Sequence, residues 1–161
     1  MFRHIVTALL VFIVYVLFVG SLSVYTALTG MIVAAILSTL FARYIITNEH
    51  KAMDIRRLFY MVYYFFKYMS IIEMRAHLDV VKRIFTMDIK PGIVRVPVRV
   101  SSRYARLLVM GSITNTPGTV VVDEKGGYFY VNWINTITDD PEVARKYISE
   151  EFEHYAYKIF E

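Results

Sequence analysis

Residues 5–42 form an unbroken run of 38 residues without Asp, Glu, Lys, Arg or His. At about 1.5 Å per residue, one helix of this length would be nearly twice as long as the roughly 30 Å hydrocarbon core of a bilayer. Two crossings fit better, over residues 4–19 and 24–41, with a turn at Gly20-Ser21-Leu22-Ser23. Because lipid offers the backbone no hydrogen-bond partner, both crossings are expected to be helices. We therefore predict a membrane-spanning helical hairpin over residues 1–45; a cleaved signal peptide is the alternative for the first apolar run.

The second predicted crossing carries a small side chain at every fourth position, namely Thr26, Gly30, Ala34 and Ser38. These positions share one helix face, and small side chains let membrane helices approach closely. We therefore predict that this face packs against another helix; the alternative is the general frequency of small residues in membrane helices. Neither crossing contains an ionisable group at membrane depth, which an ion pump requires. The hairpin alone is therefore not expected to carry ions.

The charges that follow the hairpin are distributed unevenly. Residues 43–110 contain 13 Lys and Arg against 5 Asp and Glu, whereas residues 111–161 contain 4 against 9. A basic segment directly after an apolar hairpin is typical of the cytoplasmic side of a membrane protein. We therefore predict a multi-pass protein of the cell membrane, with the N-terminus and the C-terminal domain both in the cytoplasm. The positive-inside rule accounts for this charge without a nucleic-acid partner.

Residues 54–87 are predicted to form an amphipathic helix rich in aromatic and basic residues. Its apolar run, residues 58–72, is 15 residues long and is interrupted by Lys67. Tyrosine and lysine at this density suit the headgroup region of a bilayer, so the helix is expected to lie at the cytoplasmic face. A third crossing is the alternative. On the same helix, Glu73, His77 and Asp79 could relay a proton or hold a metal against a partner subunit, although such a trio is more often the solvated side of an amphipathic helix.

Residues 88–161 show the pattern of a small α/β domain. Alternating valines after Lys90-Pro91-Gly92 predict a strand over residues 93–100, and Pro97 favours an edge position. A helix should begin at Ser101 or Ser102, followed by a hairpin of two strands and a single C-terminal helix up to Phe160. The predicted fold is a membrane α-helical hairpin plus a cytoplasmic β-α-β-β-α domain with its helices on one side of the sheet.

Signals for catalysis are almost absent. The chain has no cysteine, and it lacks the glycine-rich and HExxH patterns of nucleotide and zinc sites. We therefore predict a non-catalytic protein without cofactor or metal. Glutamine is absent as well, which is a weak compositional indication of a thermophile.

One segment of the predicted domain has a distinctive sequence, which reads Ser112-Ile113-Thr114-Asn115-Thr116-Pro117-Gly118-Thr119. With the preceding Arg106-Leu107-Leu108, it resembles the hallmark segment of the E-type subunits of the Mrp-type multisubunit sodium/proton antiporters. The resemblance extends over essentially the whole chain. The family usually has Ala-Asn where this chain has Met110-Gly111, so the end of the helix is expected to pack differently here.

The resemblance implies an accessory membrane subunit of a multisubunit cation/proton antiporter. Related modules are built into energy-converting membrane complexes, notably membrane-bound hydrogenases of anaerobic thermophiles. The expected partners are the bilayer and the other hydrophobic subunits of such a complex. The residues themselves indicate a structural role, because hydroxyls at a helix end satisfy its free backbone groups and Pro-Gly reverses the chain. A stand-alone membrane-anchored scaffold or regulatory binding module is the competing interpretation.

Overall fold

The computed structural model describes residues 2–46, 51 and 54–161. The chain divides into two compact units, residues 1–54 and 55–161, which are described separately. The helix predicted over residues 54–87 therefore belongs to the same unit as the α/β domain.

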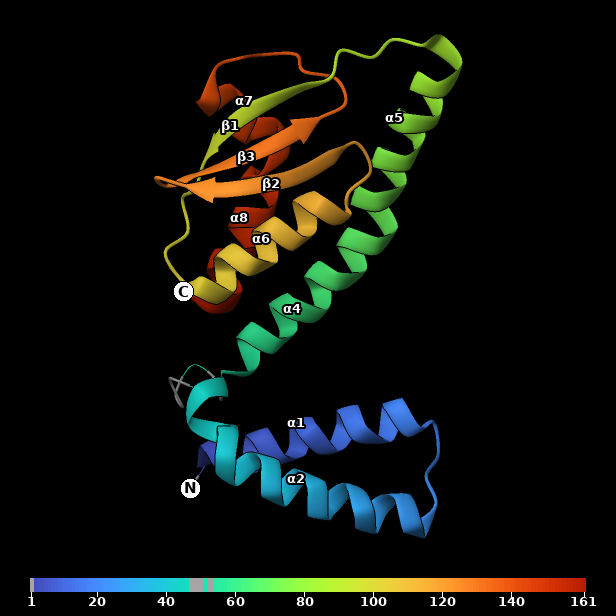
Figure 1. Cartoon of the computed structure of the whole chain (residues 1–161), viewed down its shortest axis with the longest axis vertical. Coiled ribbons are helices and arrows are strands. Elements are labelled where there is room, and N and C mark those ends of the chain that lie inside the picture. Colours follow the sequence, from blue (N-terminus) through green and yellow to red (C-terminus); the bar gives the residue numbers. More distant parts are fainter. Residues whose placement is uncertain (1, 47–50, 52–53) are drawn as a thin grey trace. The chain divides into compact units, whose positions relative to one another are not determined.

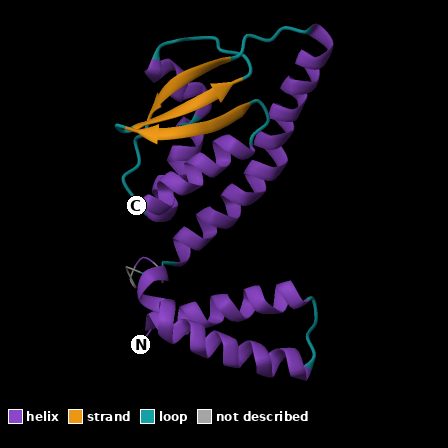
Figure 2. Ribbon diagram, in the orientation of Figure 1, coloured by secondary structure: helices purple, strands orange, loops and turns teal. Residues whose placement is uncertain are grey.

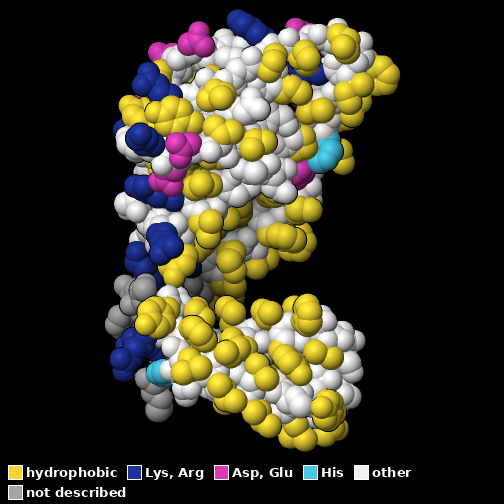
Figure 3. All heavy atoms as spheres, viewed as in Figure 1, with side chains coloured by type: hydrophobic (Ala, Val, Ile, Leu, Met, Phe, Trp, Pro, Cys, Tyr) yellow, Lys and Arg dark blue, Asp and Glu magenta, His cyan; other side chains and the backbone are white. Residues whose placement is uncertain are grey.

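The first unit contains two antiparallel helices, α1 (Phe2–Val19) and α2 (Val24–Ile45). Both are long and apolar enough to cross a membrane, and hydrophobic side chains cover the visible face of this unit (Figure 3). Gly20 adopts a φ of +66°, which suits glycine, and ends α1. Ser23 then caps α2, because its hydroxyl accepts a hydrogen bond from the Thr26 amide at 3.2 Å. The predicted helical hairpin is confirmed.

The second unit begins with one long helical rod in three parts, α4 (Ile55–Lys67), the π-helical turn η1 (Tyr68–Ile72) and α5 (Glu73–Thr86) (Figure 1). The buried residues Tyr64, Tyr68 and Ile72 follow the four-residue spacing of one helix face. In the π turn the Glu73 amide donates to the backbone oxygen of Tyr68, five residues earlier, and Glu73 is therefore also buried on this face. The buried side of the rod thus extends from Tyr64 in α4 to Glu73 at the start of α5.

The sheet is antiparallel and has the strand order β1-β3-β2 (Figure 2). Its strands are β1 (Gly92–Pro97), β2 (Thr119–Lys125) and β3 (Tyr128–Trp133). β1 is an edge strand, so Pro97 removes no hydrogen bond from the middle of the sheet. Gly126 and Gly127 make the β2–β3 turn with φ values of +61° and +81°. The β-branched and aromatic residues of alternate positions point to one face, which forms the core.

Helices α6 (Arg103–Asn115), α7 (Pro141–Ile148) and α8 (Glu150–Phe160) complete the unit. They bury Val109, Ile113 and Phe152 against Phe129 and Val131 of β3 in one hydrophobic core. The predicted hairpin-plus-α/β fold is thus confirmed, with the long rod as an additional part of the domain.

The prediction of a single C-terminal helix was wrong. The backbone of Ser149 leaves helical geometry, with φ −122° and ψ −22°, and separates α7 from α8. The Arg145 guanidinium reaches across this break to Glu150 and to the buried Glu153, both at 2.8 Å. The break lets α7 pack against β1 while α8 packs against α4 and α6.

Candidate functional site

The four-residue strip of α2 is buried within the hairpin. Thr26, Gly30, Ala34 and Ser38 are all buried, and Gly30 lies directly under two aromatic rings of α1. A Cβ atom added at Gly30 would lie 2.8 Å from Tyr15 Cδ1 and 3.2 Å from the Phe12 ring. The strip is therefore the surface on which α2 receives the aromatic side chains of α1.

Polar contacts join the two helices at several depths. The Tyr15 hydroxyl lies 3.0 Å from Thr29 Oγ1, and His4 Nδ1 lies 3.0 Å from the backbone oxygen of Ser38. Thr7 is fully buried, and its hydroxyl has no hydrogen-bond partner among the described residues. Hydrogen bonds between membrane helices contribute about 1 kcal/mol each, so these contacts add to the packing of the small strip.

The segment from Ser112 to Thr119 forms the corner between α6 and β2. The Thr116 hydroxyl donates to the backbone oxygen of Ser112 at 2.7 Å, and the Thr119 hydroxyl donates to that of Ile113 at 2.7 Å. These two oxygens lie in the last turn of α6, where intrahelical donors run out. The Thr114 hydroxyl in turn accepts the Val121 amide at 3.3 Å. The hydroxyls of this corner thus tie the end of the helix to the start of the strand.

Gly118 makes the reversal of the corner. Its φ is +95°, a conformation that L side chains rarely adopt, and its oxygen accepts the Ile134 amide at 2.9 Å. At the other end of α6, Arg106 donates to Glu124 at 2.7 Å and to the backbone oxygen of Val100 at 3.2 Å. Arg106 therefore connects α6 to β2 and to the chain that leaves β1.

Two tyrosines of the rod attach it to this corner. The Tyr64 hydroxyl lies 2.5 Å from Ser112 Oγ, and the Tyr68 hydroxyl lies 3.2 Å from Thr116 Oγ1. The Asn115 amide also donates to the Tyr68 hydroxyl at 3.2 Å. Burial raises the pKa of Tyr64 and of Tyr68 above the ordinary tyrosine value, so both stay protonated at neutral pH. The sequence predicts that the tyrosines of this helix lie at the membrane interface. Two of them, Tyr64 and Tyr68, are instead buried in the domain.

Lys67 connects the same face of the rod to α8. Its ammonium group lies 2.6 Å from Glu151 Oε1 and donates to the Tyr155 hydroxyl at 3.0 Å. These two contacts raise the pKa of Lys67 above its ordinary value, which keeps the lysine charged.

The structure separates the three residues considered for a proton relay. Glu73 is buried, and its Oε1 has no hydrogen-bond partner among the described residues. His77 is exposed, with Nδ1 2.7 Å from the backbone oxygen of Glu73 and 3.4 Å from Glu73 Oε2. Asp79 instead pairs with Arg83 at 2.7 Å on the exposed side of α5. Glu73 and His77 are therefore neighbours, and Asp79 is not part of the pair.

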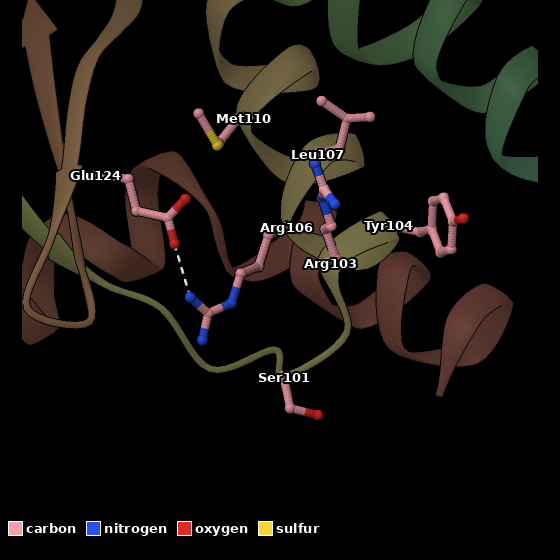
Figure 4. Close-up of a pocket in the computed structure, with 7 residues that line it drawn as sticks. All are labelled: Ser101, Arg103, Tyr104, Arg106, Leu107, Met110 and Glu124. Carbon is pink, nitrogen blue, oxygen red and sulfur yellow. Dashed lines mark hydrogen bonds and ion pairs between the residues drawn. The ribbon is translucent and has the colours of Figure 1, made fainter. Parts of the chain in front are cut away.

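A pocket of about 810 Å³ lies along the first half of α6 (Figure 4). Arg103, Arg106 and Tyr104 line it from the helix, and Glu124 closes it from β2 through its ion pair with Arg106. Among the described residues, no group of three His, Asp or Glu side chains is placed to hold a metal ion.

Comparisons with known proteins identify a family and solved structures that are similar to this chain. The family model described as "Na+/H+ ion antiporter subunit" (MNHE) matches residues 8–159. A chain of the membrane-bound sulfane sulfur reductase, described as an archaeal respiratory membrane complex, matches with a TM-score of 0.85 and 25% sequence identity. The match covers 99% of this chain and 100% of that chain. A comparison with curated proteins gave no significant match.

Proposed function

This chain belongs to the family of Na+/H+ ion antiporter subunits, and we propose that it is a non-catalytic membrane subunit of a multisubunit cation/proton antiporter module. The main support is the end-to-end similarity to a chain of an archaeal respiratory membrane complex. That similarity favours a module within an energy-converting complex, of the sulfane sulfur reductase or hydrogenase type, over a stand-alone Mrp-type antiporter. Sodium ions and protons are the proposed transported ions.

The hairpin is proposed to anchor the subunit and to pack in the complex. Residues 5–42 contain no Asp, Glu, Lys, Arg or His side chain that could bind or pass an ion. Their exposed side chains are overwhelmingly apolar, as in Leu9, Leu17, Ile32 and Leu40. Such a surface suits lipid and apolar neighbouring subunits, which is the expected environment of an assembly subunit.

The rod is proposed to lie on the cytoplasmic membrane surface and not to cross the bilayer. One of its faces is bound to the α/β domain through Tyr64, Tyr68 and Ile72. A crossing would carry that charged domain into the hydrocarbon core, at a large cost in desolvation. The opposite face exposes large apolar side chains, such as Phe59, Phe66, Met69, Leu78 and Phe85. Such a face, beside several Arg and Lys residues, suits the headgroup region.

Labelling of single cysteines tests this topology, because the native chain contains no cysteine. We expect an impermeant thiol reagent added outside cells to label a cysteine at Ser21, in the α1–α2 turn. Cysteines at Arg3 and Lys125 should react only after the membrane is permeabilised. External labelling at Lys125 would mean that the rod crosses the membrane, and would contradict the proposed orientation.

Purification of the tagged full-length chain in mild detergent tests the proposed function. An antiporter-module subunit is expected to co-purify with several very hydrophobic subunits in one complex. Deletion of the chain is then expected to abolish ion-coupled activity through loss of assembly. A chain that purifies alone, from cells in which the antiport activity survives its deletion, would identify a stand-alone membrane-anchored module instead.

The pair Glu73 and His77 provides a further test of the non-catalytic role. We expect Glu73→Gln and His77→Ala to keep ion-coupled activity within a factor of about two to three, a barrier change below ~1 kcal/mol. Activity should be measured in complexes shown to be intact by gel filtration, with Asp79→Asn as an exposed control. If either variant loses ion-coupled activity by about tenfold or more in an intact complex, the substituted residue lies on the transport pathway.

A further inference from the structure

A second cavity, of about 300 Å³, lies between α5, the Ser112–Thr119 corner and the α7–α8 pair. Thr116 and Thr119 line it from the corner, and Trp133 lines it from the end of β3. Both threonine hydroxyls already donate to backbone oxygens of α6, so their remaining lone pairs are available only as acceptors. Charge recognition in this cavity must therefore come from the helices on either side.

Two basic side chains at the rim of the cavity, Arg75 and Lys146, have no carboxylate partner among the described residues. Arg75 comes from α5 and Lys146 from α7, and within the described part of the chain neither forms an ion pair. The carboxylate in the same wall, Glu151, is held by Lys67 at 2.6 Å. The charge of the neighbouring Arg145 is already balanced by ion pairs with three glutamates. The cavity therefore presents two positive charges that face solvent.

An aromatic wall stands beside these charges. Trp133 and Tyr147 lie with ring centroids 6.3 Å apart, and Tyr147 remains 67% exposed. Tryptophan, tyrosine and arginine are the residue types that most often dominate the binding energy of protein interfaces. At about 300 Å³ the cavity lies at the lower limit of small-molecule pockets and has room for one or two side chains. A peptide segment, whose other residues can lie across the surrounding surface, fits better.

We propose that this cavity docks an acidic segment of a partner subunit, with a carboxylate between Arg75 and Lys146 and an adjacent side chain against Tyr147. The inference rests on the proposed function, because it requires a multisubunit complex. It also gives the Ser112–Thr119 corner a second role, as the rigid wall of a binding site. The hydroxyls of Thr116 and Thr119, which bond to the last turn of α6, fix the position of this wall.

Photo-crosslinking in the intact complex tests the proposal. p-Benzoylphenylalanine is placed at Tyr147, and at the exposed Tyr157 of α8 as the matched control. We expect Tyr147 to crosslink to one partner subunit, at a peptide that contains Asp, Glu or a chain-terminal carboxylate. The charge reversal Arg75→Glu/Lys146→Glu should reduce that crosslink by about tenfold or more, as loss of a charge pair at an interface does. The reversal Lys90→Glu/Lys125→Glu, equal in charge, should leave it unchanged.

Several results would overturn the proposal. These are a complex that assembles without a Tyr147 crosslink, a crosslink to an uncharged or basic peptide, and a crosslink that the Arg75/Lys146 reversal leaves intact. Stabilisation of the full chain by inorganic phosphate that depends on Arg75, without a crosslink, would assign the cavity to small anions instead. Trp133 fluorescence verifies folding of each variant, and Arg75→Ala replaces the double reversal if that variant does not fold. Absence of any complex from wild-type cells would instead refute the proposed function as well.

Discussion

Gly30→Leu is expected to disrupt the packing of α1 against α2 and to reduce the yield of assembled complex severalfold. Even a single Cβ atom at this position would come within 2.8 Å of the Tyr15 ring. A leucine must therefore displace Tyr15 and Phe12 together, and with them the hydrogen bond between Tyr15 and Thr29. Overpacking of this kind costs about 1–3 kcal/mol or more in well-packed proteins.

Two measurements separate local from general effects of this substitution. Spin labels at the exposed positions Ile5 and Phe41 should report a longer and broader interhelical distance in Gly30→Leu than in the unsubstituted hairpin. Ala35→Leu adds a large side chain on the exposed face of the same helix and should leave this distance unchanged. If both substitutions reduce assembly equally, the strip of small residues has no special role in the hairpin.

The hairpin could be predicted from the sequence because residues 5–42 contain no charged side chain. An uncharged apolar run of this length has few possible structures other than two membrane-spanning helices. The corner could be recognised for a related reason. Hydroxyl side chains next to Pro117 and Gly118 can bond to backbone groups of the preceding helix end, and these bonds do not depend on distant parts of the chain. The contacts of Thr116 and Thr119 are of this local kind.

The burial of Glu73 could not be predicted, because it depends on the π turn. With uninterrupted α-helical spacing after Tyr64, Tyr68 and Ile72, the next domain-facing positions would be 75 and 76, and Glu73 would lie at the margin. The extra residue of η1 rotates Glu73 toward the domain. Nothing in the local sequence identifies a π turn. Its first residue, Tyr68, contacts Ser112 and Thr116 at the end of α6, which are distant in sequence.

Dependence on distant contacts also explains why the sequence alone predicts the rod as a separate membrane element. Its exposed face satisfies the pattern of an interfacial helix, and its other face carries tyrosines, which suit either headgroups or a protein core with hydroxyl partners. The partners Ser112 and Thr116 lie more than 40 residues away in sequence. Only the folded domain shows that Tyr64 and Tyr68 hold the rod against the corner.

Gly118→Ala is expected to lower the free energy of unfolding of the α/β unit by about 1–3 kcal/mol, the cost of holding a non-glycine residue in a disfavoured backbone conformation. The φ of +95° gives the strain, and the new methyl group would also lie 3.0 Å from Ile134 Cγ2. Gly111→Ala is the matched control. It lies in the body of α6 with open space around the added Cβ, so it should stabilise the unit by about 0.5–1 kcal/mol. Urea unfolding of the full-length chain in detergent, followed by the fluorescence of Trp133, the single tryptophan of the chain, measures both effects in the α/β unit.

The two substitutions are expected to change the free energy of unfolding in opposite directions. The same added methyl group lies in a strained chain reversal at Gly118 and in a regular helix at Gly111. Equal effects at the two glycines would mean that the reversal at Gly118 is not strained, and that the corner tolerates an ordinary residue there.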